Sequence, residues 1–298
     1  MSWIFLSLLA YFCWSLSNLG DKILVANKFK HPFSYLFLSF LLSGAMLFSG
    51  FVVDLGQPSL QLLCFTFLAA AAYVLTSVFY IKAVSIEEIS RINMLWNITP
   101  IFSLSLAWIL LGEKLSSVEL LAMVILLMGA FLASAHFQNR KTTLSYGLVY
   151  MVLASIFYAS YAVVVRHITA GTTFFTFYFY FTIWLMPMSL TLLLSKSFRT
   201  TFVIEKKSWD YQLLGLVLLV AIIARVGVLF NQWALSQGPV ALVNATEGFQ
   251  TIFVFVVALL FTHFRPDILR EEVDRRNILF KILGGLFLVA GIVVLALK

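Results

Sequence analysis

Long apolar segments separated by short polar breaks run through the whole chain. A run of about 20 apolar residues crosses the ~30 Å hydrocarbon core of a bilayer as a helix. The pattern predicts ten such spans, at residues 3–22, 33–53, 60–82, 89–111, 117–137, 145–166, 172–194, 212–234, 240–262 and 278–297. Breaks such as His31-Pro32 and Gly238-Pro239 have turn composition. Two longer charged stretches, 196–210 and 264–276, are expected to be loops in water.

The ten predicted spans form two copies of five. An offset of 144 residues aligns Lys22 with Arg166, and an offset of 162 aligns Gly129 with Gly291. An offset of 151 gives the identical pairs Phe79/Phe230, Ala83/Ala234, Ser85/Ser236, Asn93/Asn244, Ile101/Ile252, Phe102/Phe253 and Ala107/Ala258. Because each copy has an odd number of spans, the second copy must enter the bilayer from the opposite side. The sequence therefore predicts an all-α membrane protein with two inverted five-helix repeats, 1–137 and 144–298, joined by a linker at 138–143. Inverted repeats are typical of alternating-access transporters.

Composition agrees with a membrane protein. The chain has 298 residues, of which 62% are hydrophobic and only 11% charged, so it is far too apolar for a soluble domain. The net charge of +7 is explained by Lys and Arg in membrane-flanking loops, and we expect no nucleic-acid partner. The two cysteines, Cys13 and Cys64, fall inside predicted helices, and no Cys/His cluster has metal-ligand spacing. No metal, cofactor or enzyme motif is predicted.

Two ionisable residues lie deep inside predicted spans. Arg225 and Glu247 stand on consecutive helices joined by the turn at residues 236–239. Counted from that turn, they lie about 16 Å and 12 Å deep, close to the bilayer midplane. A charge there costs at least ~2.5–3.5 kcal/mol, so it normally faces a partner or a cavity. A structural ion pair would explain both residues, but we favour a polar binding site inside the bundle.

Further polar and aromatic residues point to the same region. Polar side chains on one face of an apolar helix must point into the protein, because lipid offers no hydrogen-bond partner. The candidate binding residues beside Arg225 and Glu247 are Asn244, Thr251, Gln232, Asn93, Trp96 and Asn97, with the aromatics Trp14, Tyr73, Tyr80, Tyr158, Tyr161 and Tyr178. Asn93 and Asn244 could instead join helices, and most of the aromatics could be core or interfacial residues. Pro100 and Pro187 are candidate hinges or fixed kinks.

These residue types suit a zwitterionic solute. Arg225 could hold a carboxylate or phosphate. Aromatic walls with one carboxylate, Glu247, suit a cation, because each cation–π contact contributes ~0.5–2 kcal/mol. If Arg225 and Glu247 pair without substrate, an entering zwitterion could replace the partner of each charge. Glu247 could alternatively exchange a proton and couple transport to it.

Several motifs are shared with one known family. They are Trp14 and Lys22 in the first span, Thr99-Pro100-Ile101-Phe102, the run Leu110–Leu115, and Gly129. With these motifs the chain resembles the drug/metabolite transporter superfamily, of the ten-span EamA type, over nearly its whole length. The second half departs from the pattern, since His263-Phe264 replaces Gly112-Glu113. The resemblance implies the fold, whereas members move amino acids, nucleotide sugars, choline-like cations and other metabolites.

We therefore expect a transporter of a small polar metabolite, an amino acid or related amine, that works by alternating access. The alternatives are a proton-coupled exporter of organic cations or drugs, a flippase for a lipid-linked substrate, and a non-transporting scaffold. We expect a monomer, multi-pass in the cytoplasmic membrane of a prokaryote. The resemblance implies both termini in the cytoplasm, whereas the positive-inside rule places them outside, because most Lys and Arg fall in the loops on the other side.

Overall fold

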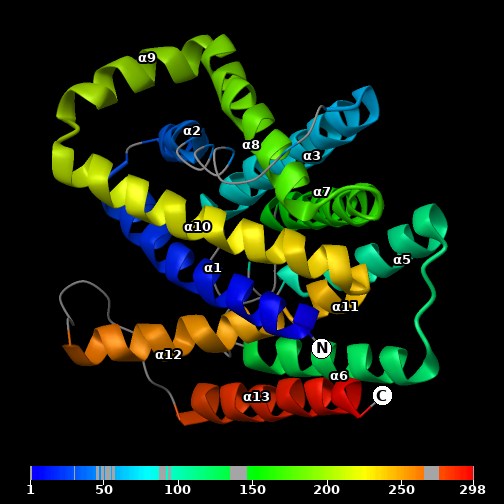
Figure 1. Ribbon diagram of the computed structural model, residues 1–298. Coiled ribbons are helices and arrows are strands. Elements are labelled where there is room, and N and C mark those ends of the chain that lie inside the picture. The colour runs from blue at the N-terminus through cyan, green and yellow to red at the C-terminus, as the bar shows by residue number, and fades with distance from the viewer. Residues whose placement is uncertain are drawn as a thin grey trace.

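The computed structural model describes residues 2–29, 31–44, 47, 50, 55, 58–86, 92, 95–134, 146–264 and 275–297, and every long regular element in these ranges is a helix (Figure 1). The helices are α1 (Ser2–Asn27), α2 (Pro32–Leu42), α3 (Leu60–Val84), α5 (Thr99–Leu111), α6 (Ser117–Ser134), α7 (Tyr146–Thr169), α8 (Phe174–Leu190), α9 (Lys196–Glu205), α10 (Tyr211–Gln237), α11 (Val240–Ala245), α12 (Gly248–Phe264) and α13 (Arg275–Ala296), with short 3₁₀ turns η2 (Thr191–Leu194) and η3 (Lys206–Ser208).

The helices have the lengths of a multi-pass membrane protein. Within the described residues, eight segments are long and apolar enough to cross a bilayer; they are Ser2–Asp21, Leu60–Ala83, Ser117–Ser134, Tyr146–Thr169, Phe174–Leu194, Tyr211–Gln237, Val240–Val257 and Ile278–Ala296. The apolar segments Phe33–Leu42 and Thr99–Leu111 are shorter. They coincide with parts of the predicted spans 33–53 and 89–111, so the count of ten spans stays a prediction.

The helices pack in reciprocal pairs. In Figure 1, α1 lies along α10, α3 crosses α7, and α6 lies beside α13. Under the predicted repeat, α1 corresponds to α7 and α3 corresponds to α10. The α1–α10 and α7–α3 contacts are therefore one contact made twice, and α6 packs on its own counterpart. This is the packing that a two-fold repeat would produce, although its inversion stays a prediction.

Small residues bring α6 and α13 close together. A Cβ atom on Gly129 would lie 2.9 Å from Cγ of Leu288, and one on Gly291 would lie 2.7 Å from Cγ of Leu126. The offset of 162 residues that aligns the two glycines also aligns Leu126 with Leu288. The leucine of each helix thus packs against the glycine of the other. Small residues such as these let the backbones of two membrane helices come close together.

Side-chain contacts define two ends of the bundle. The Ser2 hydroxyl donates to the amide oxygen of Gln237, and the rings of Phe65 and His167 lie 5.0 Å apart. The starts of α1 and α3 therefore share one end, the Ser2 end, with the last turns of α7 and α10. The opposite end, the α9 end, holds α9 between α8 and α10 at the top of Figure 1.

The stretch predicted as a loop at residues 196–210 is largely helical, so that prediction was wrong. The Ser195 hydroxyl caps α9 by accepting from the backbone N–H of Phe198 at 3.4 Å. Phe198 is buried, and the ring of Phe202 lies 5.0 Å from that of Phe37 on α2. Two aromatic residues one helical turn apart give α9 an apolar face that packs on α2.

Two predicted spans are interrupted near the middle. The span 240–262 consists of α11 and α12 with a turn at Thr246 and Glu247, and the span 89–111 has a turn at Asn97 and Ile98 before α5. Pro100 lies in the first turn of α5, where proline is favoured, so it begins a helix and interrupts none. Pro187 lies inside α8.

Candidate functional site

A cavity of about 150 Å³ lies between α2, the second halves of α1 and α3, and the middle of α10. The residues between α11 and α12, with parts of α7 and the segment before α5, complete its wall. It lies in the half of the bundle toward the α9 end. Seven candidate binding residues line it together: Trp14, Tyr73, Tyr80, Trp96, Tyr158, Arg225 and Glu247. A cavity of this size in a protein can hold a benzene-sized molecule.

Arg225 is the buried cation of the cavity. Its side chain is 3% exposed, and its Nη2 donates to the Tyr73 hydroxyl at 3.2 Å. The guanidinium carbon lies 5.1 Å from the ring centre of Tyr73 and 5.7 Å from that of Phe40. Its Nε and Nη1 have no hydrogen-bond partner. A buried guanidinium with unused donors is costly, so an anionic group entering the cavity would be stabilised there.

Glu247 lies at the turn between α11 and α12, where the helix is broken. Its Oε2 accepts no hydrogen bond, and the side chain lines the same cavity as Arg225. The two charges do not form the ion pair considered from the sequence, because Arg225 donates to Tyr73 instead. The cavity therefore contains an acidic and a basic side chain that are not paired with each other.

Aromatic rings form a connected wall around these charges. Tyr80 stacks on Trp96 with ring centres 5.8 Å apart, and Tyr158 lies edge-on to Trp96 at 5.8 Å and to Trp14 at 6.3 Å. Hydrogen bonds fix the wall: Trp14 Nε1 donates to the carbonyl oxygen of Ala224 at 3.2 Å, and the Tyr158 hydroxyl donates to Oδ1 of Asn231 at 3.3 Å. Such rings can face a cation or an apolar stem.

Four other candidates support the wall from behind. Tyr178 donates its hydroxyl to the carbonyl oxygen of Arg225 at 3.1 Å, and the ring of Tyr161 lies 5.3 Å from that of Tyr73. Gln232 and Asn244 are fully buried. Nδ2 of Asn244 donates to the Ser103 hydroxyl at 2.6 Å, which joins α11 to α5.

Two more candidates line a smaller side cavity that shares Trp96 and Glu247 with the first. Asn97 donates to the Ser134 hydroxyl at 3.1 Å, and this hydroxyl lies 3.3 Å from that of Thr251. Asn93 lies outside the described residues.

The sequence interpretation missed Asp21. Its carboxylate accepts a hydrogen bond from the Tyr35 hydroxyl, and both side chains line the main cavity with Asn18 and Gln250. The spacing of Trp14, Asn18 and Asp21 places them on one face of α1, so a helical projection would have found the cluster. Asp21 lies beside Lys22 at the end of the predicted span, where a charge is expected at the interface.

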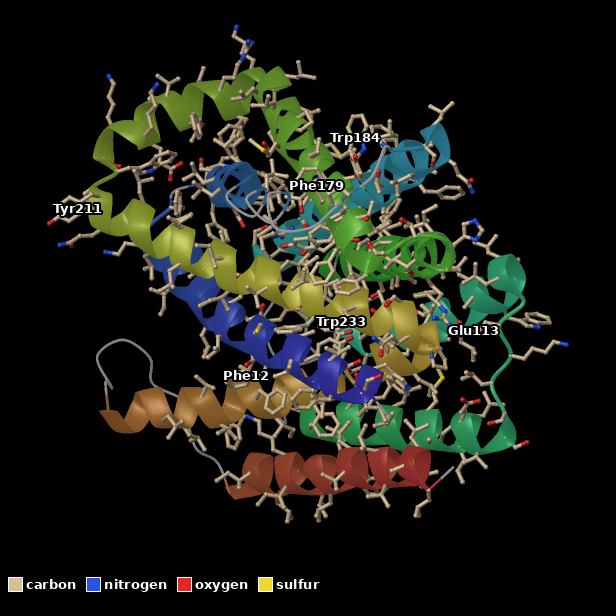
Figure 2. The ribbon with its side chains drawn as sticks, in the orientation of Figure 1. Phe12, Glu113, Phe179, Trp184, Tyr211 and Trp233 are labelled. Atoms are coloured by element: carbon tan, nitrogen blue, oxygen red, sulfur yellow. The ribbon has the colours of Figure 1, made fainter. Side chains whose placement is uncertain are left out.

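At the Ser2 end, side-chain hydrogen bonds join other helices to the turn between α10 and α11. Arg166 donates through Nη1 to the carbonyl oxygen of Ser236 at 2.7 Å and satisfies the last turn of α10. Glu113, on the connection from α5 to α6 in Figure 2, accepts from the backbone N–H of Val240 at 3.3 Å and satisfies the first turn of α11. Gly112 has φ 66°, which lets the chain leave α5 toward this contact. Burial raises the pKa of the Glu113 carboxyl, and the Val240 N–H and the positive charge of Arg166 oppose this.

The arrangement defines a helical membrane protein with a charged and aromatic cavity inside the bundle. Residues 1–135 match the EamA-like transporter family. The first part of the chain is therefore similar to a family of membrane transporters, and the helices of the whole chain have the lengths of a multi-pass membrane protein.

One solved structure shows how far the fold likeness extends. A crystal structure titled only as that of a protein matches with a TM-score of 0.73 and 16% sequence identity, covering 99% of this chain and 96% of that chain. At this identity the likeness shows the fold alone. No curated protein matches the chain.

Proposed function

We propose that the protein transports a small zwitterionic solute, an amino acid or related amine, by alternating access, and that the main cavity is its substrate site. The observation that carries the proposal is the buried Arg225, with two nitrogen atoms unbonded, in the same cavity as the unpaired Oε2 of Glu247. A zwitterion brings one charge of each sign to these two groups.

The energetics favour such a solute over one with a single charge. A carboxylate at Arg225 would form charge-assisted hydrogen bonds, each contributing ~1.5–3 kcal/mol. An ammonium at Glu247 would also face Trp14 and Trp96, with ~0.5–2 kcal/mol for each well-placed ring. A solute with one charge would leave the other buried group without a partner.

Alternating access is supported by the arrangement of the helices. The reciprocal contacts of α1 with α10 and α7 with α3 fit ten crossings in two inverted repeats, with α2 and α5 as parts of the two spans that are short here. The cavity lies toward the α9 end, whereas Arg166 and Glu113 hold the Ser2 end together. In an inverted-repeat protein, exchanging the conformations of the two halves would close the first end and open the second.

A second candidate function is export of organic cations, with Glu247 exchanging a proton for the cation. It is favoured by the stacked rings of Tyr80 and Trp96 beside a carboxylate with a free oxygen. In this case Glu247 would be essential, and Arg225 would serve only to position Tyr73.

The test is thermal stabilisation of the purified protein by amino acids, amines, nucleotide sugars and quaternary cations. A ligand at 100 times its Kd raises the free energy of unfolding by ~2.7 kcal/mol. We expect amino acids to stabilise the wild type but neither Arg225→Ala nor Glu247→Gln. Arg199→Ala, at an exposed position on α9, is the control and should respond like the wild type.

The competing outcomes separate the candidates. Stabilisation by quaternary cations that is lost with Glu247→Gln and kept with Arg225→Ala would favour the cation exporter. No stabilisation by any soluble compound, with both variants folded, would contradict both candidates and leave a lipid-linked substrate.

A further inference from the structure

The main cavity contains a third charged side chain. Among the described residues that line it, the charged ones are Asp21, Arg225 and Glu247. Asp21 is partly exposed, and the Tyr35 hydroxyl donates to it. With both carboxyl groups ionised, the two carboxylates and one guanidinium would give the cavity an excess of one negative charge, which a neutral zwitterion does not match.

The three charged side chains lie at two depths. The hydrogen bond from Trp14 to Ala224 places Trp14 beside Arg225, where α1 and α10 pack together. Asp21 follows seven residues later on the same face of α1, which corresponds to ~10 Å toward the α9 end. Glu247 belongs to the deep part, since the Tyr11 hydroxyl donates to the carbonyl oxygen of Val243 at 3.2 Å, just before the break.

We propose that the site selects a zwitterion whose side chain ends in a second positive charge, that is, a basic amino acid. This inference rests on the proposed function. The α-carboxylate lies at Arg225, the α-ammonium lies at Glu247, and the terminal cation lies at Asp21. A lysine-type stem of about four carbons covers much of the distance between the two depths.

The aromatic wall suits this stem. Tyr80 and Trp96 stack on each other in the wall of the cavity that also contains the three charged side chains, and an extended methylene chain packs well along such rings. A neutral amino acid of equal length would leave Asp21 with only the Tyr35 hydroxyl. An acidic amino acid would bring a second carboxylate toward Asp21 and be repelled.

The test compares lysine with norleucine, which has the same length but lacks the terminal ammonium. Binding to the purified full-length protein is measured by titration calorimetry for the wild type, Asp21→Asn and Tyr35→Phe. We expect the wild type to bind lysine at least 10-fold more tightly than norleucine. Asp21→Asn should lose this preference with unchanged norleucine affinity, while Tyr35→Phe, which keeps the charge, should retain it.

Other results would overturn the inference. A wild type that prefers norleucine, or an Asp21→Asn variant that loses both ligands equally, would mean that Asp21 does not recognise the side chain. In both cases amino-acid binding that depends on Arg225 would leave the proposed function intact. Failure of both ligands to bind the wild type would contradict the inference and the proposed function together.

Discussion

Trp14 packs closely against α10 because the residue at position 227 is a glycine, which has no Cβ atom. A Cβ atom on Gly227 would lie 2.7 Å from both Cδ1 and Nε1 of Trp14 and 3.3 Å from the carbonyl oxygen of Ala10. The indole ring is rigid and donates a hydrogen bond to the carbonyl oxygen of Ala224, and the oxygen of Ala10 belongs to the backbone. Neither group can therefore move away easily from an added Cβ atom. We therefore expect Gly227→Ala to force α1 away from α10 or to turn Trp14 into the cavity.

Gly215 is the matched control on the same helix, because a Cβ atom there would meet nothing within 4 Å. Both substitutions gain up to ~1 kcal/mol of helix propensity. Only Gly227→Ala also suffers overpacking, which costs ~1–3 kcal/mol. Since ~1 kcal/mol shifts the Tm of a large domain by about 2–4 °C, the two variants should differ by several degrees.

The assay is thermal unfolding of both purified variants, followed by binding of a stabilising ligand. We expect Gly215→Ala to melt at or above the wild type and to bind normally. Gly227→Ala should melt below it and bind more weakly, because Trp14 is part of the cavity wall. Equal melting points and equal affinities for the two variants would refute the described contact between α1 and α10.

Three further results should follow from the described contacts. Arg225→Lys should weaken binding of an amino acid ~10-fold but leave its decarboxylated amine unaffected in the same titration; equal losses would exclude a carboxylate at this residue. Glu113→Ala should cost ~1–3 kcal/mol, since the N–H of Val240 loses its acceptor, whereas Glu113→Gln keeps one. Because burial raises the pKa of Glu113, the stability that its proton provides is lost as pH rises through that pKa. Glu113→Gln should therefore melt at or above the wild type at pH 7, with no such advantage at acidic pH; an advantage that grows on acidification would reverse the sign. Gly291→Ala should cost ~1–3 kcal/mol by overpacking, while Gly285→Ala, whose Cβ would have its nearest neighbour at 3.9 Å, should be tolerated; equal melting points would argue against the α6–α13 contact.

The hydrophobic pattern predicted the helical class and most spans, because apolar length is a property of the segment alone. It did not predict the turn at Thr246 and Glu247 or the helix at 196–205. A helix break inside an apolar run depends on tertiary contacts, and the Phe198 and Phe202 face of α9 is short enough to be read as a charged loop.

The sequence predicted those site residues whose charge is unfavourable inside a bilayer. Arg225 and Glu247 stood out because no lipid-facing position tolerates them. The sequence did not predict that Arg225 and Glu247 are unpaired or that Arg225 donates a hydrogen bond to Tyr73. Both features depend on how α3 and α10 pack, which no local sequence pattern specifies. Asp21 was missed because a charge near a helix end is common, and only the packing of α1 against α2 turns it toward the cavity.

Under the predicted repeat, the two ends of the bundle differ at one position that matters for their hydrogen bonding. At the Ser2 end, Arg166 and Glu113 satisfy the turn from both sides. Their counterparts in the predicted repeat are Lys22 and Phe264, and a phenylalanine cannot accept a hydrogen bond. If the halves exchange conformations, the conformation in which the α9 end is closed has one hydrogen bond fewer, and this bond contributes ~0.5–1.5 kcal/mol. This difference corresponds to a population ratio of about 2–12, so the unloaded protein would wait predominantly with one side accessible. The phenylalanine at position 264, where the first repeat has Glu113, would thus favour one of the two conformations of the protein in the absence of substrate.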